Sequence, residues 1–142
     1  MTVRAARDDE GEGIHVLVDQ MTRRYGWTLP ACSWKKIAPF WYIAEVSGVI
    51  IGAVQVCIGW PVGRLELLAV RPDLSHTKKA KIVKALIYHA VAAMQLDGTQ
   101  LVMTLIPSLD ENFSRILERL GGRFAVKGSM VMFDLREVHD AI

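Results

Sequence analysis

Apolar residues along this chain occur in two patterns, one typical of helices and one typical of strands, and their order predicts an alternation of the two. Two segments repeat apolar residues every three or four positions, the helical spacing: Ile14 to Met21, and about Lys78 to Gln95. Short runs rich in β-branched and aromatic side chains are instead typical of strands. Five segments have this character: residues 3–6, 40–46, 49–58, 64–71 and 101–106.

Turn and capping residues delimit these segments. Ser47 and Gly48 separate two strand-like runs and predict a hairpin. Ser108 and Glu111 form a capping-box pattern at the start of a further helix, which extends to about Leu120. Three short elements complete the order: a helix at residues 33–37 and a strand pair at residues 123–126 and 130–135.

Hairpins beside a strand–helix–strand crossover predict an α/β (α+β) fold with a mixed, largely antiparallel sheet and helices on both faces. No internal repeat or low-complexity linker divides the 142 residues, so a single domain over residues 1–142 is expected. No apolar run approaches the ~20 residues that span a bilayer, and no signal-peptide pattern is present. A cytoplasmic location without a membrane partner is expected, or a virion if the protein is viral.

Charge and metal-binding residues narrow the range of partners. The net charge of +2 is too small to indicate nucleic acid as a partner. Cys32 and Cys57 have no CxxC spacing and the four histidines are scattered, so no metal site is expected and both thiols are expected to be reduced.

Three segments together resemble the GNAT-type N-acetyltransferase superfamily. Residues 68–72, Leu-Ala-Val-Arg-Pro, resemble the Leu-Ala-Val-x-Pro end of the family's fourth strand. Residues 82–87 resemble the start of its long cofactor helix, and residues 110–124 resemble its late helix and the glycine motif that follows. The sequence is also similar in outline to degenerate, motif-poor members from bacteriophages. The resemblance implies the family's fold over nearly the whole chain.

The resemblance implies acetyl-coenzyme A as the cofactor. In this family a loop of pattern Q/R-x-x-G-x-G/A binds the pyrophosphate at the long helix, where unpaired N–H groups and the helix dipole favour an anion. In this chain Lys78 replaces the first residue of that pattern, and Lys81 and Val83 replace both glycines. The link from Val70 is also about three residues longer than the family pattern. The implied cofactor-binding residues are Leu68, Ala69, Val70, Lys78, Lys79, Ala80, Lys81, Ile82 and Val83.

Lysines crowd the first turns of the long predicted helix, where each cation opposes the helix dipole at a cost of about 0.3–1 kcal/mol. One interpretation is that a bound anion such as a phosphate offsets this repulsion. The other is that the long side chains carry their charges into water.

Glu66 is the candidate catalytic base, since the resemblance implies that a carboxylate removes a proton from the acceptor amine. It is the only carboxylate on the matching strand, and its parity from Val70 predicts that both side chains share one face. The alternative is a plain salt bridge with Arg64 or Arg71. The position of the family's usual tyrosine acid holds Leu117, and Tyr88 is expected in the core.

Two functions remain open at this point, beside a third, a nucleic-acid binder acting through the lysine-rich helix start, which has only local charge behind it. The first is an acetyl-coenzyme A-dependent N-acetyltransferase that acts on a small-molecule or protein amine. The second is a catalytically silent binding or assembly module of the same fold, in a homo-oligomer or a bacteriophage virion. Aromatic residues near the first hairpin either line an acceptor pocket or pack in a core or between subunits: Tyr25, Trp27, Trp34, Trp41 and Tyr42.

Overall fold

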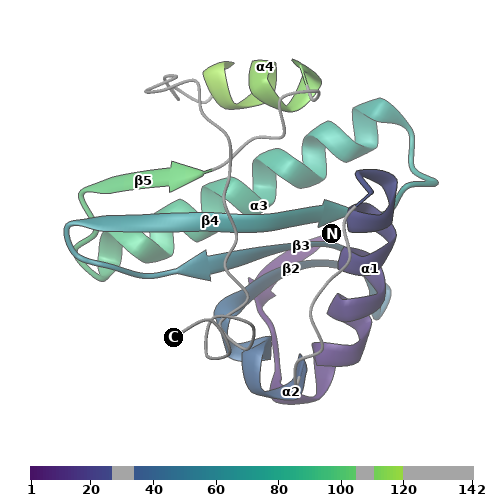
Figure 1. Cartoon of the computed structure of the whole chain (residues 1–142), viewed down its shortest axis with the longest axis horizontal. Coiled ribbons are helices and arrows are strands. Elements are labelled where there is room, and N and C mark those ends of the chain that lie inside the picture. Colours follow the sequence, from purple (N-terminus) through teal and green to yellow (C-terminus); the bar gives the residue numbers. More distant parts are fainter. Residues whose placement is uncertain (27–33, 105–110, 120–142) are drawn as a thin grey trace, which may run out of the picture. The chain divides into compact units, whose positions relative to one another are not determined.

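A computed structural model of the chain describes residues 1–26, 34–104 and 111–119 (Figure 1). It divides into two compact units, Met1–Thr104 and Leu105–Ile142. In the second unit the described part is helix α4, Glu111–Arg119. No helix in the described ranges is both long enough and apolar enough to cross a membrane. Several sequence predictions fall outside these ranges, namely those for Trp27, Cys32, Ser108 and the strand pair at 123–126 and 130–135.

The first unit is built on one five-stranded sheet with the strand order β1-β2-β3-β4-β5. The first four strands are antiparallel neighbours, and β5 lies parallel to β4. This confirms the mixed, largely antiparallel sheet. The strands are β1 (Thr2–Ala5), β2 (Trp41–Val46), β3 (Val49–Cys57), β4 (Val62–Val70) and β5 (Leu101–Thr104).

The predicted hairpin joins β2 to β3. Ser47 and Gly48 both have positive φ angles, 50° and 78°, which matches the two central residues of a tight hairpin turn. Glycine adopts such a φ without strain, so the Ser-Gly pair specifies the turn locally.

Helices cover both faces of the sheet, as predicted (Figure 1). A Cβ atom added to Gly52 of β3 would lie 2.6 Å from Cγ2 of Ile82, so Gly52 faces helix α3 (His76–Leu96). The next residue, Ala53, packs in a cluster with Ile14 of helix α1 (Gly11–Arg24). Successive residues of a strand point to opposite faces, so α3 and α1 lie on opposite sides of the sheet.

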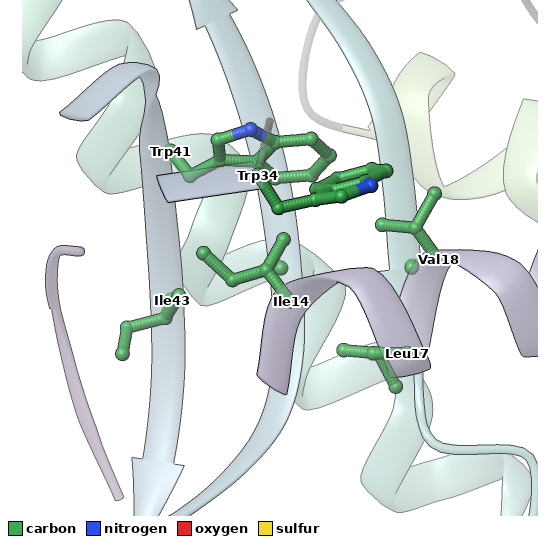
Figure 2. Packing of buried hydrophobic residues seen from close by; sticks show 8 residues of the cluster. Ile14, Leu17, Val18, Trp34, Trp41 and Ile43 are labelled. Carbon is green, nitrogen blue, oxygen red and sulfur yellow. The ribbon is translucent and has the colours of Figure 1, made fainter. Parts of the chain in front are cut away.

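The α1 side holds an aromatic and aliphatic core, which Figure 2 shows from close by. Trp34 comes from the short helix α2 (Trp34–Ile37), and its ring lies 6.1 Å from that of Trp41 and 4.7 Å from that of His15. A 3₁₀ turn, η2 (Ala38–Phe40), leads from α2 into β2. The interpretation that aromatic residues near the first hairpin pack in a core is therefore confirmed for Trp34 and Trp41. The cluster consists of Ile14, Leu17, Val18, Trp34, Trp41, Ile43, Ala53 and Ala69.

The α3 side is covered by the predicted apolar stripe of the long helix, but the expectation that Tyr88 lies in the core is wrong. Tyr88 is 71% exposed, because it lies on the outward side of α3, away from that stripe. The apolar run at residues 101–106 is typical of a fully buried strand, but Leu101 and Met103 are more than half exposed, because they lie on the α1 side of β5, beyond the part of the sheet that α1 covers. The stripe itself is buried, with Ile82, Val83, Leu86, Ile87, Ala90 and Met94.

Charged groups tie the first strand to its neighbours. Glu10 ends a 3₁₀ turn, η1 (Asp8–Glu10), and accepts two hydrogen bonds from the Arg4 guanidinium, at 2.8 and 2.7 Å. It also accepts one from the backbone N–H of Arg7, at 2.7 Å, while Arg4 reaches Glu45 of β2 at 2.5 Å. Hydrogen bonding to Arg4 lowers the pKa of Glu10 from 4.5 to about 2. The network therefore stabilises the fold through an ionised carboxylate.

We predict that Glu10→Gln lowers the free energy of unfolding at pH 7 by about 1–3 kcal/mol, because the Arg4 guanidinium loses a charged partner. The folded-state pKa lies below the ordinary one, so the contribution is complete above pH 4.5 and disappears as the pH falls towards 2. Denaturant titrations between pH 2 and 7 should show the two proteins converging in acid. Exposed Glu12 supplies the control, Glu12→Gln, and a pH-independent difference would contradict the prediction.

Candidate functional site

Strand β4 carries a bulge in its middle. Ala53 pairs with Ala69 but Gln55 pairs with Glu66, so two residues of β4 stand opposite one residue of β3. One of the two is Leu67, whose φ is 46°. A bulky residue rarely adopts a positive φ, and such strained positions concentrate at functional sites. The bulge therefore marks this part of β4 as a candidate functional site.

The bulge also reverses the predicted relation between Glu66 and Val70. Val70 pairs with Gly52, which faces α3, whereas Glu66 pairs with Gln55, three residues further along β3. Since side chains alternate along β3, Gln55 and Glu66 lie on the α1 side. The prediction that Glu66 and Val70 share one face is wrong, because the extra residue in β4 shifts the alternation.

Beyond the bulge, the α1 side of the sheet changes from a covered apolar surface to a more polar and accessible one. The row Ile43, Ala53 and Ala69 lies beneath α1. The next rows hold charged, polar and sulfur-containing side chains that are half-buried or exposed, and we call them the open face. The open face consists of Gln55, Cys57, Arg64, Glu66 and Met103.

Two charges of the open face pair with each other. Nε of Arg64 lies 3.3 Å from Oε1 of Glu66, which confirms the salt-bridge alternative with Arg64. The pair remains accessible, with the side chain of Arg64 62% exposed and that of Glu66 37% exposed. Beside them, burial first and then the Glu66 carboxylate raise the pKa of the Cys57 thiol. The site therefore presents an ionised pair next to a neutral thiol.

The open face adjoins a stretch of β4 that pairs with β3 on one side and, among the described residues, with no strand on the other. In the described residues, β4 pairs with β5 from Val62 to Leu65, and β4 then continues to Val70. The backbone of Leu68, Ala69 and Val70, which the resemblance implies in cofactor binding, lies in this stretch. Ala69 turns its own side chain into the α1 core, so only its backbone is available to a ligand there.

The long helix begins two residues earlier than the sequence suggested, at His76. Ser75 is its N-cap: the side chain accepts a hydrogen bond from the N–H of Lys78, and the carbonyl accepts one from the N–H of Lys79. In the described part of the chain this leaves the N–H groups of His76 and Thr77 at the open end of the helix. The early start also leaves a link of only five residues, 71–75, after β4.

The predicted cofactor-binding residues consequently divide into two groups. Lys78 and Lys81 are exposed, and Ala80 is partly exposed. Lys79 lies beside them, but its ammonium donates to the carbonyl of Pro72 at 2.7 Å and so braces the loop. Ile82 and Val83 instead pack in the core, and their N–H groups lie inside the helix. These two residues are therefore not available for direct ligand contact.

A second ion pair shapes the same loop. The Arg71 guanidinium donates two hydrogen bonds to the Asp73 carboxylate, at 3.0 and 2.6 Å. The pair borders a cleft of about 460 Å³ between this loop, α1 and the start of β3. The cleft is lined by Gly13, Val16, Leu17, Gln20, Ile50, Arg71, Pro72 and Asp73.

Solved structures of other proteins share this architecture. Rv2747 from Mycobacterium tuberculosis, solved with CoA, matches 99% of this chain and 80% of its own, with a TM-score of 0.70 and 20% identity. The aminoglycoside N-acetyltransferase AAC(6')-Iy, also solved with CoA, matches 94% of both chains, with a TM-score of 0.74 and 17% identity. The chain has the GNAT acetyltransferase fold.

The likeness extends to the fold and no further. A transcriptional regulator from Bacillus halodurans matches 93% of this chain and 99% of its own, with a TM-score of 0.72 and 16% identity. No protein-family model matches the sequence. No curated protein matches it either. Function must therefore be argued from the site, because one GNAT-like architecture can support different activities.

Nothing in the sequence signals the bulge or the strain at Leu67. Residues 65–70, Leu-Glu-Leu-Leu-Ala-Val, form a continuous apolar run with a single charge, which fits a regular strand equally well. The N-cap had a weak signal, because Ser75 precedes the lysines by three residues without the usual acidic partner of a capping box.

The geometry of the open face can be tested through Cys57, in a Cys32→Ser background. We predict that a thiol reagent labels Cys57 slowly at pH 7, with a midpoint above that of an ordinary thiol. Glu66→Gln should accelerate labelling, because it removes the carboxylate that disfavours the thiolate. Measured pH profiles of the labelling rate that are identical with and without Glu66 would contradict this arrangement.

Proposed function

We propose that this protein is an acetyl-coenzyme A-dependent N-acetyltransferase that acts on a small-molecule amine. The observation that carries the proposal is the bulge of β4 at Leu67, which lies between Glu66 on the open face and the backbone of residues 68–70, whose edge away from β3 has no partner strand among the described residues. Two proteins of the same fold were solved with CoA, and one of them is named for acetyl transfer to aminoglycosides.

The start of α3 supports cofactor binding. The N–H groups of His76 and Thr77 and the helix dipole favour an anion such as a pyrophosphate. Lys78 and Lys81 add positive charge on the exposed side of the same turns. Because the helix begins at His76, Lys81 and Val83 lie inside it, where no close approach to a phosphate is required. Their replacement of glycine is therefore compatible with binding.

The open face supports direct transfer to the amine. Glu66 is ionised beside Arg64 and can accept a proton as the amine nitrogen attacks the thioester carbon and the C–S bond breaks. A transfer through Cys57 is disfavoured, since its raised pKa keeps the thiol protonated. Leu117, in α4, cannot donate a proton, so water protonates the departing thiolate in this scheme.

The second candidate is a catalytically silent module that binds the cofactor or a protein partner. The Arg64–Glu66 pair favours it, because the salt bridge accounts for the position of Glu66 without a role in catalysis. A homo-oligomer, a bacteriophage virion and a cytoplasmic location also remain predictions of the sequence. Binding and turnover measured separately discriminate between the two candidates.

For cofactor binding, we predict that Lys78→Ala and Lys81→Ala each weaken the affinity for acetyl-coenzyme A, by roughly fivefold to tenfold at low salt, through the loss of a phosphate contact. Isothermal titration calorimetry measures this effect. Lys84→Ala, one turn further along α3, is the matched control and should bind like the wild type. An absence of heat at millimolar ligand would remove the cofactor site.

For catalysis, we predict that Glu66→Gln lowers kcat/KM by about 10²-fold or more while the affinity for acetyl-coenzyme A stays unchanged. Release of the coenzyme A thiol in the presence of a panel of amines reports turnover. Wild-type binding without turnover of any amine would favour the silent module. Unchanged turnover in the variant would exclude Glu66 as the base.

A further inference from the structure

The open face contains both a cation and an anion at the place where the acceptor would bind. Arg64 and Glu66 are neighbours on one face of β4, about 7 Å apart along the strand, and their side chains converge to 3.3 Å. The registered neighbours of this pair are the uncharged residues Gln55, Cys57 and Met103. Within the described residues, the open face therefore has one positive and one negative group.

Arg64 has donors to spare for a ligand. Its Nε faces Glu66, and the described residues contain no other carboxylate in an ion pair with its guanidinium. The guanidinium carries five N–H donors in a planar fork that matches a carboxylate. Because the side chain is 62% exposed, a ligand carboxylate can reach this fork without a rearrangement of the sheet.

We propose that the acceptor is an amino-acid-like molecule, a small primary amine that carries a carboxylate a few bonds away. This inference rests on the proposed function and specifies its substrate class. The Arg64 guanidinium binds the carboxylate, and the Glu66 carboxylate receives the amine. The ligand thus replaces one ion pair by two, and the face remains electrically balanced.

The same charges disfavour a polycationic acceptor. An aminoglycoside carries several ammonium groups, for which the open face offers a single carboxylate, already neutralised by Arg64. A cation placed beside Arg64 is repelled, and like-charge contacts of this kind are a common source of specificity. The mixed pair therefore selects for a ligand that is itself both basic and acidic.

The test compares α-amino acids with their α-carboxamides, which keep the amine and side chain but lose the negative charge. Binding is measured by NMR titration of the full chain, with and without coenzyme A. We expect the acids to bind roughly tenfold or more tightly than the amides. Arg64→Gln should abolish this preference and Arg64→Lys should retain part of it. Arg23→Gln, which removes an exposed arginine paired with Asp19 on α1, should behave as the wild type.

Each outcome separates this inference from the proposed function. Equal binding of acids and amides, tighter binding of an aminoglycoside, or no binding of either class would overturn the inference. Turnover of amines without any preference for the acids would overturn it while acetyl transfer stands. Amino acids that bind through Arg64 but are never acetylated would instead overturn the enzymatic function and leave the binding site.

Discussion

The residue that β4 inserts opposite β3 is the constraint on which the arrangement of the site depends. Without it, the alternation of the strand would put Glu66 on the α3 side, where the long helix packs against the sheet. With it, the carboxylate lies on the side left partly open by α1. The extra residue gives Leu67 a strained backbone with a positive φ angle, and the packing of Leu67 against the apolar cluster beneath α1 stabilises this conformation. The bulge thus divides β4 into a part that packs in the core, at Ala69, and a part with accessible charged side chains, at Arg64 and Glu66.

Two groups of ion pairs in this unit differ in how strongly they are bound into the fold. At β1, Glu10 is nearly surrounded by the guanidinium of Arg4 and the backbone and side chain of Arg7, so its charge is fully used by the fold. On the open face, Arg64 and Glu66 form a longer contact and stay accessible. The first pair contributes to stability, whereas the second is weakly coupled to the fold and can exchange its partner for a ligand. This contrast is why the open face, and not the better-bonded network, is the candidate site.

The sequence predicted the architecture well because its signals are local. The periodic stripe of α3, the Ser47-Gly48 turn and the alternating strands each reflect contacts within a few residues, and the structure confirms them. The site was less predictable for a related reason. The bulge depends on how Gln55 and Ala53 of a different strand pair with β4, and nothing in residues 65–70 records that register. The exposure of Tyr88 was missed because an aromatic residue in an apolar stretch suggests burial on either side of a helix.

The start of α3 shows how a small error in a boundary changes a functional argument. With a helix beginning at Lys78, the lost glycines at positions 81 and 83 would lie at the mouth of the helix and argue against a phosphate. With the helix capped by Ser75, the open N–H groups belong to His76 and Thr77, and residues 81 and 83 belong to the helix interior. The two glycine positions then fall inside the helix, where the backbone does not need to approach a ligand closely, while the exposed side chains of Lys78 and Lys81 remain near its start. In the proposed function, cofactor binding therefore depends on the backbone at His76 and Thr77 more than on the missing glycines.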